Sequence, residues 1–169
     1  MALEASIGRE VASQPQREMA LEPSGEHDFD MLLLDNQLCF RLYLASKEII
    51  NRYHPYLEPL GLTYTQYITM MVIWEERSVS MKDLCERLSL KSSTLTPLVK
   101  KLEAAGYVAR ERSKDDERSL IVSLTQAGLE LRDRARAVPE CVSRDIDLQV
   151  EEAVALAAAL DKLIAVIGR

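Results

Sequence analysis

Residues 80–112 read SMKDLCERLSLKSSTLTPLVKKLEAAGYVARER, and this stretch decides the fold. Its first part has apolar residues at helical spacing: Met81, Leu84, Cys85 and Leu88. Because Ser80 and Asp83 form a typical helix start, we predict a helix here. After a break at residues 89–90, the same spacing returns at Leu95, Leu98, Val99 and Leu102. It predicts a second helix, from about Ser92 to Ala105, with Gly106 as its C-terminal cap.

A β-hairpin is predicted after these helices. Residues 107–112 and 119–124 have the pattern of two strands, and the polar residues 114–117 between them predict a turn. Before them, the capping box of Thr63 and Gln66 predicts a helix from Tyr64 to about Glu76. Helix, turn, helix and ribbon in this order are typical of a winged helix-turn-helix. We therefore predict a mostly α protein with a small β-hairpin wing, and a DNA-binding region over residues 63–125.

Helical patterns flank this region. One runs from about Phe29 to Tyr53, where we expect His54 and Pro55 to end it. Thr125 caps a helix that Pro139 interrupts, and a last helix carries apolar residues from Ile146 to Ile167. The first and last patterns each have an apolar stripe that a second copy of the chain would bury, so residues 28–62 and 126–169 are predicted to be dimerisation helices. Alternatively, these helices pack on each other within one chain. Residues 1–27 have the composition of a disordered tail.

Charge is unevenly distributed along the chain. The whole sequence carries a net charge of -6, whereas residues 91–114 carry +4, as a phosphate-binding surface would. A solvated face with chance clustering is the alternative. The sequence has no apolar run long enough to span a membrane and no signal-peptide pattern. With its 3 cysteines, it is expected to be a cytoplasmic protein with free thiols.

The start of the helix over residues 92–105 has the small polar groups that read base edges. The predicted DNA contacts there are Lys91, Ser92, Ser93, Thr94 and Thr96. Either serine can instead be the N-terminal cap, and we expect that one of them is. In the hairpin turn, Arg118 is suited to a minor groove and Asp116 can orient its guanidinium. An ordinary surface ion pair is the alternative for these two residues.

Cys39 lies early in the first helical pattern and is a candidate redox sensor. Hydrogen-bond donors lower the pKa of a thiol, and Tyr53 and Tyr64 are candidate donors. If residues 39–53 form one helix, Cys39 and Tyr53 are separated by about 21 Å. They can then meet only across an antiparallel dimer. The alternative is a thiol buried in the core.

The other two cysteines differ in context. Cys85 falls on a predicted core stripe and is assigned to packing. Cys141 follows Pro139 at an expected helix break, which suggests exposure. It is a candidate resolving cysteine that would form a disulfide with an oxidised Cys39. Nothing in the sequence fixes the distance between these two thiols.

Four segments resemble the MarR family, and more narrowly its organic-hydroperoxide-sensing repressors. They are LDNQLCFRLYLAS (34–46), LGLTYTQYITMMVIWE (60–75), LSLKSSTLTPLVKKLEAAGYV (88–108) and DERSLIVSLTQAG (116–128). The resemblance implies a homodimer that binds a palindromic operator in duplex DNA. It implies that Cys39 is oxidised by organic hydroperoxide, that the partner's Tyr53 and Tyr64 bond its sulfur, and that oxidation releases DNA. The acidic N-terminal tail departs from the shorter family pattern.

Two other functions are compatible with parts of the sequence. A small aromatic ligand can replace peroxide as the signal, as in the wider family. A thiol peroxidase is the enzymatic alternative, but the sequence lacks a thioredoxin-like βαβ pattern, so we expect no enzyme. His27 and His54 are isolated, no cysteine pair has ligand spacing, and the glycines form no phosphate loop. We therefore expect neither a metal nor a cofactor.

Overall fold

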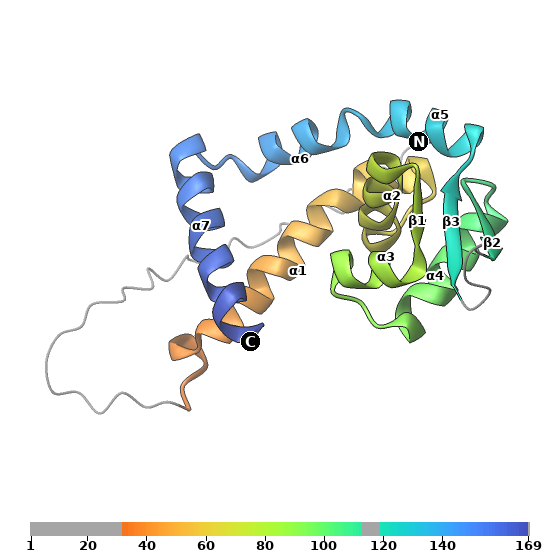
Figure 1. Ribbon diagram of the computed structural model, residues 1–169. Coiled ribbons are helices and arrows are strands. Elements are labelled where there is room, and N and C mark those ends of the chain that lie inside the picture. Colours follow the sequence, from red (N-terminus) through yellow and green to blue (C-terminus); the bar gives the residue numbers. More distant parts are fainter. Residues whose placement is uncertain (1–31, 113–118, 169) are drawn as a thin grey trace, which may run out of the picture. The chain divides into compact units, whose positions relative to one another are not determined.

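The computed structural model describes residues 32–112 and 119–168 (Figure 1). The chain divides into two compact units, Met1–Tyr43 and Leu44–Arg169, which we describe separately. In the first unit, a short 3-10 helix, η1 (Leu34–Asn36), precedes the start of α1 (Leu38–Leu57). The tail predicted over residues 1–27 lies outside the described residues. None of the described helices is long and apolar enough to cross a membrane.

The helix α1 differs from its prediction at both ends. Gln37 is extended, with φ -87° and ψ 111°, so the helix starts at Leu38 rather than near Phe29. At the other end, the prediction that His54 and Pro55 stop the helix is wrong, because α1 includes both and ends at Leu57. Proline removes one backbone donor, but only two residues of helix follow it. Leu57 is only 1% exposed, so burial of its side chain stabilises this last turn.

Local capping signals place the next helices as predicted. After a second 3-10 helix, η2 (Glu58–Leu60), Thr63 and Gln66 form the expected capping box of α2 (Tyr64–Glu76). The Ser80 side chain accepts a hydrogen bond from the Asp83 backbone and caps α3 (Met81–Leu88). Both caps satisfy backbone donors that have no partner within the helix.

The sheet has one more strand than the sequence predicted. The strands β2 (Val108–Arg112) and β3 (Leu120–Leu124) form the expected antiparallel ribbon after α4 (Ser92–Ala104). A three-residue strand, β1 (Ser78–Ser80), pairs antiparallel with β3, so the strand order is β1-β3-β2. β1 ties the chain between α2 and α3 to the wing and completes the winged helix-turn-helix.

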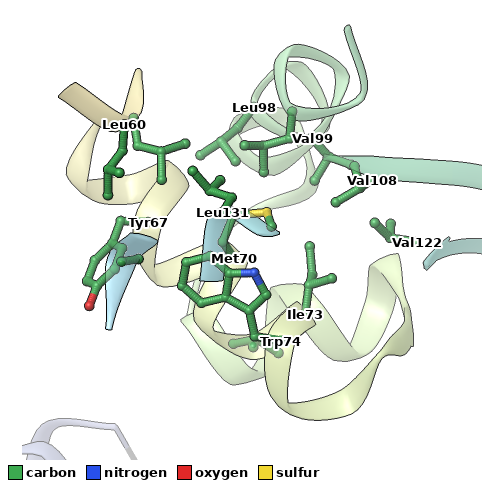
Figure 2. Close-up of a cluster of buried hydrophobic side chains, with 14 of the residues drawn as sticks. Leu60, Tyr67, Met70, Ile73, Trp74, Leu98, Val99, Val108, Val122 and Leu131 are labelled. Carbon is green, nitrogen blue, oxygen red and sulfur yellow. The ribbon is translucent and has the colours of Figure 1, made fainter. Parts of the chain in front are cut away.

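One core joins these elements (Figure 2). Met70 and Ile73 of α2, Val99 of α4 and Val122 of β3 are fully buried. The indole nitrogen of Trp74 donates a buried hydrogen bond of 2.8 Å to the carbonyl oxygen of Gly128. This bond connects α2 to α5 (Gln126–Ala135), which Thr125 caps as predicted.

After α5 the chain forms two further helices, whereas the sequence predicted only one last helix there. Pro139 lies in the first turn of α6 (Val138–Ile146), a position where proline is tolerated because its missing donor would be unpaired anyway. Asp147, with φ 52°, ends α6, and α7 (Val150–Ile167) follows. Ile146 therefore belongs to α6 rather than to the last helix. α7 has no buried residue within the chain.

Candidate functional site

The first turn of α4 is exposed, and its cap differs from the prediction. Lys91 is the N-cap residue, and no side chain caps the helix, so the expectation that Ser92 or Ser93 does so is wrong. Ser92, Ser93 and Thr94 are all exposed, and the hydroxyls of Ser92 and Thr96 lie 3.4 Å apart. Neither serine hydroxyl caps the helix, so both are presented on its exposed first turn, where Ser92 pairs with Thr96.

The positive charge of the 91–114 segment is partly neutralised. Arg110 of β2 donates from Nε and Nη2 to the same carboxylate oxygen of Glu103 in α4, at 2.8 and 2.5 Å. This pairing holds the pKa of the Glu103 carboxyl below its usual range. The cations that remain exposed on α4 and at its start are lysines, at positions 91, 100 and 101.

The wing is only partly described. β2 and β3 pair from Val108 with Leu124 to Arg112 with Leu120, which confirms the hairpin. The predicted contacts Asp116 and Arg118 fall in the turn between these strands, outside the described residues. Their roles remain predictions.

Cys39 is the second residue of α1 and is exposed, as a reactive thiol must be. The alternative of a thiol buried in the core of its own chain is therefore not supported. Tyr43 follows four residues later on the same helix face, is 60% exposed, and stacks near Phe40 with 6.4 Å between ring centres. The helical spacing of Cys39 and Tyr43, four residues apart, is a signal in the sequence for this proximity.

Tyr53 and Tyr64, which the sequence suggests as hydrogen-bond donors to the Cys39 thiol, are in contact. Their ring centres lie 4.9 Å apart, and Tyr67 lies 5.9 Å from Tyr53. Burial, and secondarily the neighbouring Tyr64, raises the pKa of the Tyr53 phenol above its usual value. Tyr53 therefore stays protonated near neutral pH and can donate a hydrogen bond. Cys39 belongs to the other unit, so its bond to these phenols stays a prediction.

A cavity of about 450 Å³ adjoins Tyr64. Its walls are formed by the second half of α1 and by the chain that leads into α2, and they are largely apolar, with Ile50, Leu57 and Leu62. His54, Asn51 and Glu58 add polar groups. Its size and lining suit a small organic molecule.

The remaining thiols lie in different settings. Cys85 is partly buried against the core, in agreement with its assigned packing role. Cys141 lies inside α6 rather than at a helix break, and it is only partly exposed. The Arg144 guanidinium donates to its sulfur at 3.6 Å. In the same helix, Asp145 accepts a hydrogen bond of 2.8 Å from Tyr56 of α1.

Metal ligands do not gather in the described residues. Nowhere in these two ranges do three or more His, Cys, Asp or Glu side chains come together in a group that could hold an ion.

Known proteins resemble this chain in sequence and in structure. Residues 51–134 match the family described as transcriptional regulator SarA/Rot. The organic hydroperoxide resistance transcriptional regulator of Bacillus subtilis strain 168 is 43% identical over 114 residues, which cover 68% of this chain and 78% of the relative. The structure of reduced AbfR bound to DNA superposes with a TM-score of 0.67 at 34% identity, over 80% of this chain and 95% of AbfR. The structure of disulfide-formed AbfR superposes with a TM-score of 0.59 at 34% sequence identity. The match covers 80% of this chain and 93% of that AbfR chain.

The fold, the exposed start of α4 and these similarities define a transcriptional regulator of the winged helix-turn-helix class. More narrowly, the chain belongs to the MarR family, in the group that includes the organic hydroperoxide resistance regulator.

Proposed function

We propose that this protein is a redox-controlled repressor, which binds duplex DNA as a homodimer and releases it when organic hydroperoxide oxidises Cys39. The observation that carries the redox part is the contact between Tyr53 and Tyr64, with 4.9 Å between their ring centres. Two adjacent phenols can both donate hydrogen bonds to one sulfur atom, which in the proposed homodimer is that of Cys39 of the partner subunit. Such a protein acts in the cytoplasm, where the DNA lies.

DNA reading falls to α4 and the wing. Hydroxyls at the start of a recognition helix bond base edges and phosphates. We assign this role to Lys91, Ser92, Ser93, Thr94 and Thr96. We assign a minor-groove contact to Arg118, with Asp116 orienting its guanidinium. In a homodimer the two α4 helices would lie about 34 Å apart, one turn of DNA, on a palindromic operator. AbfR, at 34% identity, has been captured on DNA in its reduced form, which supports DNA binding by the reduced state.

The dimer is assigned to α1 and α7, in line with the predicted regions 28–62 and 126–169. α7 exposes apolar side chains along its length, among them Val150, Val154 and Ile164, each more than 60% exposed. Apolar surface of this extent is typical of an interface. An antiparallel partner would bring its own Cys39 to the tyrosine pair of this chain.

The chemical step starts with the thiolate of Cys39. It attacks the terminal oxygen of the hydroperoxide and the O–O bond breaks, which gives a sulfenic acid and an alkoxide that takes a proton from water to become the alcohol. The apolar cavity beside Tyr64 offers space for the organic part of the peroxide. A second thiol then attacks the sulfenic sulfur, forms a disulfide and releases water. Cys141, beside the Arg144 guanidinium, is the candidate for this second thiol, and a small cellular thiol is the other. The covalent change moves the dimer helices and alters the spacing of the α4 helices.

Substitution of Cys39 tests the redox switch. The C39S variant should bind DNA as the wild type does and should stay bound after cumene hydroperoxide, whereas the wild type is released. Mobility shift on a fragment from the upstream region of its own gene measures this, with C85S as the matched control that keeps the response. Wild-type protein that retains DNA with Cys39 oxidised, as mass spectrometry would show, contradicts the proposal.

The cavity also favours a second candidate, release by a small aromatic ligand. Its volume of about 450 Å³ fits one aromatic ring with a polar substituent, and His54 and Tyr64 can bond that substituent. The same C39S variant separates the two functions, since a ligand-responsive protein keeps its response without the thiol.

A further inference from the structure

A second groove lies between α2 and α4. It has a volume of about 310 Å³. Thr65 and Gln66 line it from the first turn of α2, and Thr94 and Lys101 line it from one face of α4. Pro97 and Leu98 form the apolar part of the lining. The groove therefore adjoins the exposed turn of α4 that we assign to base reading.

The lining of the groove carries positive charge without any carboxylate. Lys101 is its one ionisable lining residue, and no carboxylate lines it. Lys101 is exposed, and none of the ion pairs formed among the described residues includes it. Two other cavities contrast with it, because Glu58 lines one and Glu76 and Asp83 line the other. A lysine without opposing carboxylates favours an anionic occupant.

Two polar side chains in the first turn of α2, Thr65 and Gln66, have hydrogen-bond donors that can face the groove. The Gln66 side-chain oxygen accepts the Thr63 backbone N–H at 2.8 Å, which fixes the amide group. The Gln66 side-chain nitrogen has no hydrogen-bond partner among the residues that the structure describes. The Thr65 hydroxyl lies 3.2 Å from that of Thr63 and is exposed. A hydroxyl, an amide and an ammonium group thus surround one groove, and all three can donate to an oxygen anion.

The position of the groove, beside the first turn of α4, indicates that its anion is a phosphate of DNA. An α-helix is about 10–12 Å wide and fills a major groove about 12 Å wide, so the flanks of a reading helix meet the phosphate backbone. Thr94 belongs both to the first turn of α4 and to the groove. From there, Lys101 lies two helical turns further along the same face.

We propose that this groove binds a phosphate of the DNA backbone, which makes Lys101, Thr65 and Gln66 part of the DNA interface. The inference rests on the DNA binding proposed above. It adds α2 to the contact surface and assigns to that helix a role in affinity and register rather than in base recognition, because phosphates carry no sequence information. Pro97 suits such a groove wall, since proline presents an apolar surface without a backbone donor.

The salt dependence of DNA binding tests the proposal. Each phosphate contact releases counterions, so the slope of log K against log salt changes by about 0.9 for each contact that is lost. The probe is a mixed-sequence duplex of about 30 base pairs, since phosphate contacts are sequence-independent. We expect K101Q to reduce the slope by about 0.9 per bound protomer and to weaken binding about three- to tenfold. K101R should restore both, because guanidinium also binds phosphate.

Two further variants make the result specific. K162Q removes the same charge from α7 and should leave the slope unchanged. T65V keeps the shape of Thr65 without its hydroxyl, and should weaken binding about two- to threefold at an unchanged slope, because it removes one neutral hydrogen bond. Unaltered far-ultraviolet circular dichroism shows that each variant is folded, as expected for exposed positions. If K101Q and K162Q give the same affinity and slope, the groove inference is wrong and DNA binding stands. If the wild type binds no duplex, the proposed function itself is wrong.

Discussion

Two features of single side chains control the proposed redox chemistry. Cys39 is exposed, and the phenols of Tyr53 and Tyr64 are brought together by packing between α1 and α2. A thiol reacts as its thiolate, and hydrogen-bond donors stabilise that form. The phenol of Tyr53 is protonated throughout the neutral range, as its ordinary pKa near 10.0 already ensures, and burial raises that pKa further, so it can serve as a donor.

Removing the phenols should slow the reaction of Cys39. We expect Y53F and Y64F each to reduce the alkylation rate of Cys39 at neutral pH about three- to tenfold, because each removes a hydrogen-bond donor to its sulfur. The rate of iodoacetamide labelling against pH, followed for Cys39 by peptide mass spectrometry, measures this. Y56F is the matched control, because the Tyr56 hydroxyl bonds Asp145 instead. Equal labelling rates in all four proteins would remove the phenols from the mechanism.

Residue roles differ in how far the sequence predicts them. The capping roles of Thr63, Ser80 and Thr125 are confirmed, because each depends on neighbours within three residues. The cap of α4 was predicted wrongly, since several adjacent polar residues compete for that position and tertiary contacts choose the register. The sequence predicted Tyr53 and Tyr64 as donors to the same thiol, but not their contact with each other. That contact depends on the turn between α1 and α2, which has no periodic pattern in the sequence.

At the level of elements, errors occur where local patterns are weakest. The helices α2, α3 and α4 and the strands β2 and β3 match their predictions within about two residues. β1 was missed because its three residues are too few for an alternating pattern, and pairing with β3 defines it. α1 continues through Pro55 because burial of Leu57 offsets one lost hydrogen bond. These are tertiary effects that override local preference.

A glycine sets the distance between α5 and the wing. A β-carbon added at Gly128 would overlap the backbone oxygen of Tyr107 and approach Leu124 within 2.7 Å. We expect G128A to reduce the free energy of unfolding by about 1–3 kcal/mol, because backbone cannot move aside as a side chain does. Urea titration followed by circular dichroism measures the loss. Q126A, at an exposed position on the same helix, is the control and should stay within about 0.5 kcal/mol of the wild type.

At the scale of the whole molecule, the described chain leaves much apolar surface uncovered. α7 has no buried residue, while α2, α4 and the sheet form a core that is complete without it. A domain with its own core and an apolar helix outside it is suited to assembly with a second copy. The sequence predicted these apolar stripes but left open what covers them, since periodicity shows an apolar face and not its partner.

Carboxylates introduced on the apolar face of α7 should separate the subunits of the dimer. We expect the double variant V154E/I164E to be monomeric at micromolar concentration, because two unpaired carboxylates would be buried in the interface. Analytical ultracentrifugation measures the mass. The variant should keep its winged-helix core and lose operator affinity by at least about tenfold, since only one half-site is held. K162E, a charge change on the same helix, is the control. A double variant that sediments as a dimer would place the interface elsewhere.

The hydrogen bond between Trp74 and Gly128 has a practical consequence. Trp74 is the single tryptophan of the chain and is 8% exposed, with its indole held against α5. Intrinsic fluorescence of this protein is therefore emitted from the middle of the DNA-reading domain. Emission that stays blue-shifted while peroxide or salt dissociates the complex would show, without any attached dye, that the packing around Trp74 survives the release of DNA.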